Sequence, residues 1–251
     1  MKKLVFLFLF CGSYLQASAQ TPKVVPFVLG LVDDSKGRAW VKDHPQESTL
    51  VDKFHSTENN LVTYVDSLIK EENKRTYDKV IASVSTWEKK DCFYCREFKR
   101  IQSKKLVEHM NEAYSFKWKD EVDENNYKIY RGVLKPKAFP EDLEKYSFLA
   151  GAYVRYGNQE EEKYSLKLNS KSKFDAILRE LKALRCDILK VDIKDGETAT
   201  QLITFLPTPK LKAYLDKQEP LRLAIQKKKE KFFQERKNSG LFSTAEEEQQ
   251  N

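Results

Sequence analysis

The feature of this sequence that most constrains its fold is a pair of cysteines separated by two residues, in the segment Cys92-Phe93-Tyr94-Cys95. Residues 79–86 before the pair are rich in β-branched residues and predict a strand, whereas residues 96–114 after it have apolar residues at helical spacing. At the start of a helix, backbone N–H groups and the helix dipole stabilise a thiolate, so Cys92 could act as a nucleophile and Cys95 as its resolving partner. The same spacing also serves in half of a zinc site or in a plain structural disulfide.

Zinc and haem are the weaker interpretations of this pair. A zinc site would also need Cys186 and one of His44, His55 and His109, and the sequence has no second closely spaced pair. Haem attachment requires a histidine directly after the second cysteine, where Arg96 stands. We therefore predict no metal and no cofactor, and we expect Cys186 to be a buried structural thiol.

The remaining segments alternate strand and helix patterns. Strands are expected at residues 24–32, 38–42, 115–119, 148–156, 163–168, 187–193 and 198–206, and helices at 58–74 and 172–185. The Asp195-Gly196 dipeptide suits the tight turn of a hairpin between the last two strands. Pro220 divides the C-terminal stretch into two predicted helices, because proline cannot continue the helix ladder. We identify no internal repeat.

This layout resembles the thioredoxin-like family over roughly residues 77–184. Beyond the cysteine pair, Glu121-Val122-Asp123-Glu124-Asn125 is similar to the exit of the family's second strand. Tyr130-Arg131-Gly132-Val133 resembles the segment before the family's cis-proline, and Pro136 is the best positional match to that proline.

The resemblance implies an α+β or α/β fold, with a thioredoxin-like central domain between an N-terminal strand-helix extension and a C-terminal hairpin-plus-helix extension. We therefore divide the chain into a segment at 1–19 that we predict to be a signal peptide, the N-terminal extension at 20–76, the thioredoxin-like domain at 77–186, and the hairpin, basic helices and acidic tail at 187–251. The resemblance also implies thiol-disulfide exchange, with Cys92, Cys95 and Pro136 as catalytic residues.

The sequence departs from the family's pattern beside both parts of this site. Asp91 stands where the family has tryptophan, and an acid next to Cys92 disfavours its thiolate. Residues 137–147 separate Pro136 from the next predicted strand, and Pro140 competes for its role. Whether the chain is an enzyme therefore stays open. The alternative is a non-catalytic accessory or structural subunit of an envelope protein assembly, in secretion, motility or the outer membrane.

The first nineteen residues have the three parts of a cleaved bacterial signal peptide. Lys2 and Lys3 precede the apolar run Leu4–Phe10, and Ala17-Ser18-Ala19 supplies the small residues of a cleavage site. We therefore predict a periplasmic or outer-membrane-associated protein that begins at Gln20. Lipid attachment at Cys11 is the alternative, although the bulky Phe10 precedes that residue.

The positive charge of the chain is local. The net charge is +7, and residues 208–240 contain ten basic and four acidic residues. We predict that the basic C-terminal helices bind other envelope proteins, because a local concentration of charge does not imply an affinity of the whole protein for nucleic acid. Since export also disfavours nucleic acid as a partner, we predict that the protein binds none. No later segment is long and apolar enough to span a membrane, and a peripheral membrane contact is compatible with the basic stretch.

Overall fold

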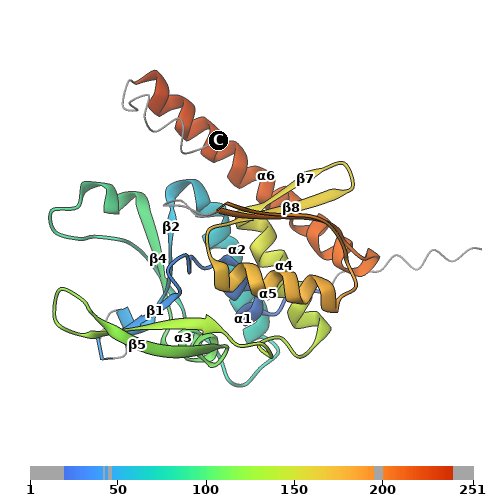
Figure 1. Cartoon of the computed structure of the whole chain (residues 1–251). Coiled ribbons are helices and arrows are strands. Elements are labelled where there is room, and N and C mark those ends of the chain that lie inside the picture. The colour runs from blue at the N-terminus through green and yellow to red at the C-terminus, as the bar shows by residue number, and fades with distance from the viewer. Residues whose placement is uncertain (1–19, 42, 45–46, 195–199, 240–251) are drawn as a thin grey trace, which may run out of the picture.

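Two helices lie at the centre of the structure with their backbones in contact. The computed structural model describes residues 20–41, 43–44, 47–194 and 200–239. Within them, α1 (Val24–Leu31) packs along α4 (Asp142–Tyr156) (Figure 1). A Cβ atom on Gly30 would lie 2.2 Å from the carbonyl oxygen of Phe148, and one on Gly151 would lie 2.0 Å from that of Phe27. The helices approach this closely because both glycines lack a side chain.

The other elements surround this helix pair in a mixed α+β arrangement of helices and small antiparallel sheets. Before α4 come β1 (Arg38–Val41), β2 (Leu50–His55), α2 (Asn59–Asn73), β3 (Ser83–Thr86), β4 (Phe98–Gln102), α3 (Lys104–Glu112), β5 (Tyr114–Val122) and β6 (Lys128–Leu134). After α4 come β7 (Gly157–Glu160), β8 (Lys163–Leu168), α5 (Lys171–Ala183), β9 (Asp187–Lys194), β10 (Thr200–Leu206) and α6 (Pro209–Asn238). Three short 3-10 turns join them: η1 (Glu47–Thr49), η2 (Ser56–Glu58) and η3 (Phe93–Glu97).

The order of these elements reveals an internal duplication. From α1 to α3 and again from α4 to α6, the chain runs helix, two strands, helix, two strands, helix. The second unit forms the sheet β7-β8-β10-β9, and the first forms β2-β4-β3, which has the matching order without its first strand. That strand, β1, instead pairs with β6 in a third sheet, β1-β6-β5. The β5–β6 hairpin therefore lies between the two units in sequence and takes one strand from the first. Our sequence-based conclusion that there is no repeat is wrong.

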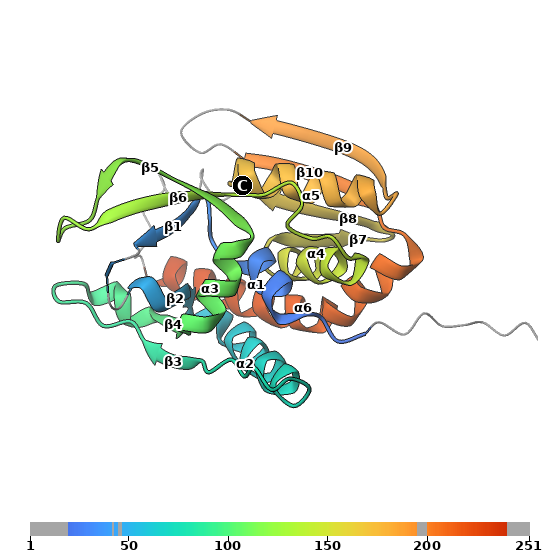
Figure 2. The same cartoon turned by 90° about the horizontal axis from the view of Figure 1, so that it is seen from below.

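One hydrophobic core joins both units. It includes α1, which is buried almost throughout, and it extends from Val24 to Ile225 in α6. On β8 and β10 the buried residues alternate with partly exposed or exposed ones, so one face of their sheet is apolar and the other polar. The apolar face is covered by α4 and α5, as Figure 2 shows. No helix among the described residues is long and apolar enough to cross a membrane.

The prediction of a thioredoxin-like fold is wrong. Every strand pairing in the described residues is antiparallel. The long helix expected at residues 96–114 is instead strand β4 followed by the short helix α3, and β4 pairs with β3 in a hairpin. The cysteine pair lies in the loop of that hairpin, so no strand passes directly into a helix there.

Two of the expected strands are the two central helices. Residues 24–32 and 148–156 were expected to be strands, but they contain α1 and the second half of α4. Apart from Arg155, both runs are apolar, because each packs against the other and against the core. A short, wholly apolar run has no period that distinguishes a buried strand from a buried helix.

Other predicted elements are confirmed. The structure has helices α2 and α5 and strands β8, β9 and β10 close to the expected positions, and Ser170 rather than Ser172 caps α5. The Asp195-Gly196 turn lies outside the described residues. The division of the basic stretch at Pro220 is wrong, because α6 continues through this residue. Packing of the flanking turns against α4 and α2 compensates for the lost hydrogen bond.

We predict that Gly30→Ala and Gly151→Ala each destabilise the protein. Glycine-to-alanine changes inside a helix usually stabilise by about 0.5–1 kcal/mol. Here the added methyl group meets backbone atoms of the other helix, so we expect a loss of about 1–3 kcal/mol in the free energy of unfolding. Urea denaturation measures it. Ser67→Ala on the exposed side of α2 is the control, and unchanged stability of both glycine variants contradicts the close contact.

Candidate functional site

The end of α1 is held by side chains from α4 and α5. The last carbonyl groups of a helix have no partner within it and carry partial negative charge. At α1, the carbonyl oxygen of Leu31 accepts hydrogen bonds from Arg155 Nη1 at 2.9 Å and from the Tyr156 hydroxyl at 3.0 Å. The carbonyl oxygen of Val32 accepts from Tyr156 at 3.2 Å and from the buried Lys173 ammonium. Two cations and a hydroxyl thus satisfy this helix terminus.

Three carboxylates balance these cations. Asp52 lies 2.7 Å from Arg155 Nη1, and Glu58 lies 3.1 Å from Nη2. Asp34 lies 3.2 Å from Lys173 Nζ, with both side chains almost wholly buried. Lys229 of α6 also reaches Glu58, at 3.0 Å. We call Asp34, Asp52, Glu58, Arg155, Tyr156 and Lys173 the helix-end network.

The electrostatics of the helix-end network follow from this burial and pairing. Burial alone would raise the pKa of Glu58, but Arg155 and Lys229 lower it below its ordinary value. Burial lowers the pKa of Lys173, although Asp34 opposes this effect. Burial also raises the pKa of Tyr156, so its hydroxyl stays protonated and can donate to the two carbonyl oxygens. Each carboxylate has a cation as its partner, and together with Lys229 three cations face the three carboxylates, so the arrangement is a structural junction between the two units. The buried Oδ2 atom of Asp34 accepts no hydrogen bond within the described chain.

The open faces of the two duplicated sheets carry basic side chains. On the sheet of the second unit, Lys163, Lys167, Lys190 and Lys194 are exposed. Register places Lys167 and Asp192 beside Leu202, and Lys190 beside Thr204, all on the face opposite the core. Lys190 pairs with Asp192 at 2.6 Å. Within the described residues, Lys163, Lys167 and Lys194 have no carboxylate at salt-bridge distance.

The sheet of the first unit has two cations on the corresponding face, and both are half-buried. Lys53, Arg100 and Ser85 are cross-strand neighbours on β2, β4 and β3. The Lys53 ammonium lies 3.8 Å from the centroid of the Trp87 ring, which is a cation–π contact. We call the two surfaces the basic sheet faces; their cations are Lys53, Arg100, Lys163, Lys167, Lys190 and Lys194.

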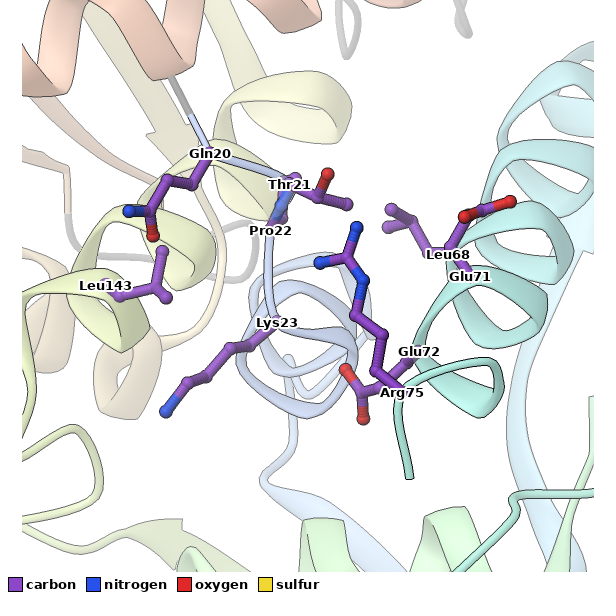
Figure 3. A pocket seen from close by; sticks show the side chains of 9 residues that line it. All are labelled: Gln20, Thr21, Pro22, Lys23, Leu68, Glu71, Glu72, Arg75 and Leu143. Carbon is purple, nitrogen blue, oxygen red and sulfur yellow. The ribbon is translucent and has the colours of Figure 1, made fainter. Parts of the chain in front are cut away.

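A separate pocket of about 470 Å³ lies where the described chain begins. Figure 3 shows Lys23 and Leu143 on one side of it and Leu68, Glu72 and Arg75 on the other. Its charged groups are largely engaged: Lys23 pairs with Glu141 at 2.6 Å, and Glu72 accepts the Val24 N–H at 3.0 Å. These contacts fasten residues 20–24 to the ends of α2 and α4.

The structure does not place the predicted redox residues Cys92, Cys95 and Pro136 in the geometry that we expected. Cys92 and Cys95 form a disulfide at the start of the turn η3, and Cys95 is fully buried. No α-helix starts at the pair, so the helix dipole that would stabilise a Cys92 thiolate is absent there. Pro136 is exposed in the connection between β6 and α4, and none of the described peptide bonds is cis. The catalytic roles of these three residues stay predictions, whereas their expected geometry is not found.

Cys186, His44 and His55 behave as structural residues. Cys186 is a buried free thiol, and burial raises its pKa. His55 lies 3.1 Å from Glu97 and packs against Phe98 and Phe232, and His44 packs against Tyr127. Among the described residues, no three histidine, cysteine, aspartate or glutamate side chains form a group that could hold a metal ion.

Comparison with known proteins finds similarity only at the level of structure. No family model and no curated protein matches the sequence. The solved structures that resemble the chain include variants of the homing endonuclease I-DmoI, at 15% identity and a TM-score of 0.48, over 77% of this chain and 95% of that one. I-DmoI in complex with DNA and Ca matches at 16% identity and a TM-score of 0.46, over 72% and 82% of the two chains. Its complex with DNA and Mn matches at 14% and 0.46, over 79% and 96%.

These findings contradict several of our sequence-based predictions. The neighbours are homing endonucleases and not thioredoxin-like proteins, so the proposed thiol-disulfide function and its alternative, an envelope accessory subunit, are not supported. The predicted partners, envelope proteins and no nucleic acid, conflict with neighbours that were solved with target DNA. Since the TM-scores are below 0.5, any functional proposal must rest on this chain's own residues.

One sequence signal could have revealed the helix pair. Phe27-Val28-Leu29-Gly30 and Phe148-Leu149-Ala150-Gly151 share the pattern of a phenylalanine three residues before a glycine, within an apolar run. The helix-end network had no such signal, because its members come from five separate parts of the chain.

We predict that Glu58 contributes a pH-dependent part of the stability. Its pKa is lower in the folded state than its ordinary value of 4.5, so its contribution is present above that pH and is lost as the pH falls through the folded pKa. Between about pH 5 and pH 3, wild type should therefore lose more stability than Glu58→Gln. Chemical denaturation across this range measures the difference. Asp66→Asn, at the ion pair with Lys70 on α2, is the control, and a Glu58→Gln profile parallel to wild type refutes the assignment.

Proposed function

We propose that the protein binds the sugar-phosphate backbone of a nucleic acid through its basic sheet faces. The observation that carries the proposal is that the sheet of the second unit buries one face and presents four exposed lysines on the other, while Lys53 and Arg100 lie half-buried on the corresponding face of the first sheet. Phosphate groups are recognised chiefly by such side chains, and their neutralisation releases counterions. The surface supports backbone contact and gives no argument for a preferred base sequence.

The balance of charge on the second sheet favours an anionic ligand. Its open face has four lysines against Glu160 and Asp192, and Asp192 is already paired with Lys190. The neighbours of these lysines, Ser165 and Thr204, are short and polar, and the apolar Leu202 lies between Lys167 and Asp192. An extended polyanion can contact several such cations at once.

We propose that the protein binds nucleic acid, and we assign no chemistry to the helix-end network. The carboxylates of the helix-end network are neutralised by Arg155, Lys173 and Lys229, and Asp34 and Glu58 are almost wholly buried. The network therefore joins the two units, and the basic sheet faces supply the contact surface. The DNA in the similar solved structures is bound by those proteins.

We predict salt-dependent binding that charge reversal on the sheet face weakens. Fluorescence anisotropy with a labelled DNA duplex should show a dissociation constant that rises steeply with salt concentration. In the double variant Lys163→Glu/Lys167→Glu, the slope of log affinity against log salt should fall by about two, because two phosphate contacts are lost.

The matched control for this double variant lies on the other side of the same sheet. Lys171→Glu/Lys182→Glu makes the same charge change on exposed positions of α5, which covers the buried face. It should retain the wild-type slope within about one unit. Equal losses in both double variants, or binding that does not respond to salt, refute the proposed surface.

We also propose that the protein is exported, on the basis of residues 1–19 alone. Those residues lie outside the described part of the chain, and the proposal is independent of the basic sheet faces. Expression of the full chain in a bacterium should give a periplasmic or outer-membrane-associated product whose first residue is Gln20, as measured by fractionation and mass spectrometry. Ala17→Asp/Ala19→Asp should block cleavage. A cytoplasmic product that retains Met1 would contradict export.

A further inference from the structure

The hairpin β5–β6 and strand β1 present a row of aromatic rings on one face of their sheet. Register places Trp40, Tyr130 and Trp118 side by side across β1, β6 and β5. The Trp40 and Tyr130 ring centroids are 5.9 Å apart, and Trp40 also lies 5.0 Å from Phe116. Phe116 in turn contacts the buried Tyr114 at 5.8 Å. The row therefore begins in the core and continues outward.

The outer end of this row is open to solvent. Trp118 is 41% exposed, although its indole N–H is satisfied by the carbonyl oxygen of Glu121 at 3.0 Å. The hairpin extends away from the central helices, as Figures 1 and 2 both show. A large aromatic side chain at such a position is not required by the core, whose contacts are made by Tyr114 and Leu134 at the other end of the hairpin.

One cation, Lys128, lies at the outer end of the row. Lys128 lies on the same face, with its ammonium 4.5 Å from the Trp118 ring centroid, whereas Lys117 and Lys119 lie on the opposite face of the sheet. The acids of the hairpin tip are mostly engaged. Glu121 accepts two hydrogen bonds from Arg131, Asp123 accepts backbone N–H groups of the turn, and Glu124 pairs with Lys89 at 3.4 Å. Among the described acids of the hairpin tip, Asp120 is the one for which no such contact is found.

We infer that this aromatic row, Trp40, Tyr130 and Trp118, stacks the unpaired bases of single-stranded nucleic acid. The inference rests on the proposed function and adds a substrate class to it. Bases of every sequence have a π-face, so aromatic platforms combined with basic side chains bind single strands with little sequence preference. In a duplex the bases are stacked on one another and do not reach such a platform, so the row separates single-stranded from double-stranded ligands.

The test compares a labelled twelve-nucleotide oligothymidine with a duplex of equal length, by fluorescence anisotropy at fixed salt. Trp118→Ala should bind the single strand about five- to 150-fold more weakly, the range that corresponds to the loss of one stacked base, and should bind the duplex as wild type does. Trp118→Phe should retain most of the single-strand affinity while losing part of the tryptophan fluorescence quenching on binding. Circular dichroism checks that each variant is folded.

Tyr77→Ala is the matched control, because Tyr77 is a fully exposed aromatic residue outside the row. It should leave both affinities unchanged. The inference is overturned if Trp118→Ala leaves single-strand binding unchanged or weakens both ligands equally. The proposed function fails separately if Lys163→Glu/Lys167→Glu changes neither affinity while Trp118→Ala still removes single-strand binding.

Discussion

The contact between α1 and α4 is the constraint on which the rest of the structure depends. Gly30 and Gly151 let the two backbones meet, and this meeting brings the C-terminal end of α1 within reach of side chains from α4 and α5. A helix end in the interior requires hydrogen-bond donors, and donors that are cations require carboxylates. The helix-end network is therefore a consequence of the close packing, and it ties the two units together.

Duplication of one unit explains the distribution of polar and apolar surface. Each unit covers one face of its sheet with helices, and basic side chains lie on the other face, exposed in the second unit and half-buried in the first. The first unit differs because β1 has joined the β5–β6 hairpin. This exchange creates the aromatic row, since Trp40 comes from β1 and its neighbours from the hairpin.

The cysteine pair shows how a local motif can suggest the wrong fold. Two cysteines separated by two residues are compatible with a helix N-terminus and equally with a hairpin loop, and the element that comes after the second cysteine distinguishes the two. Residues 98–102 have both Phe98 and Ile101, which fit a helix period, but they form a strand because β2 and β3 flank them on both sides. Strand pairing at a distance overrode the local pattern.

The sequence by itself determined the elements with one clear apolar stripe or alternation, namely α2, α5, β8 and β10, because these need only one buried face. The sequence also determined β9, whose apolar residues alternate although they are exposed. It also determined that Cys186 is buried. Only the tertiary structure decided that α1 and α4 are helices, because a segment that is buried on all sides has no hydrophobic periodicity that distinguishes a helix from a strand. The same holds for the helix-end network and the basic sheet faces, whose residues come together only through the pairing of distant strands and the crossing of two helices.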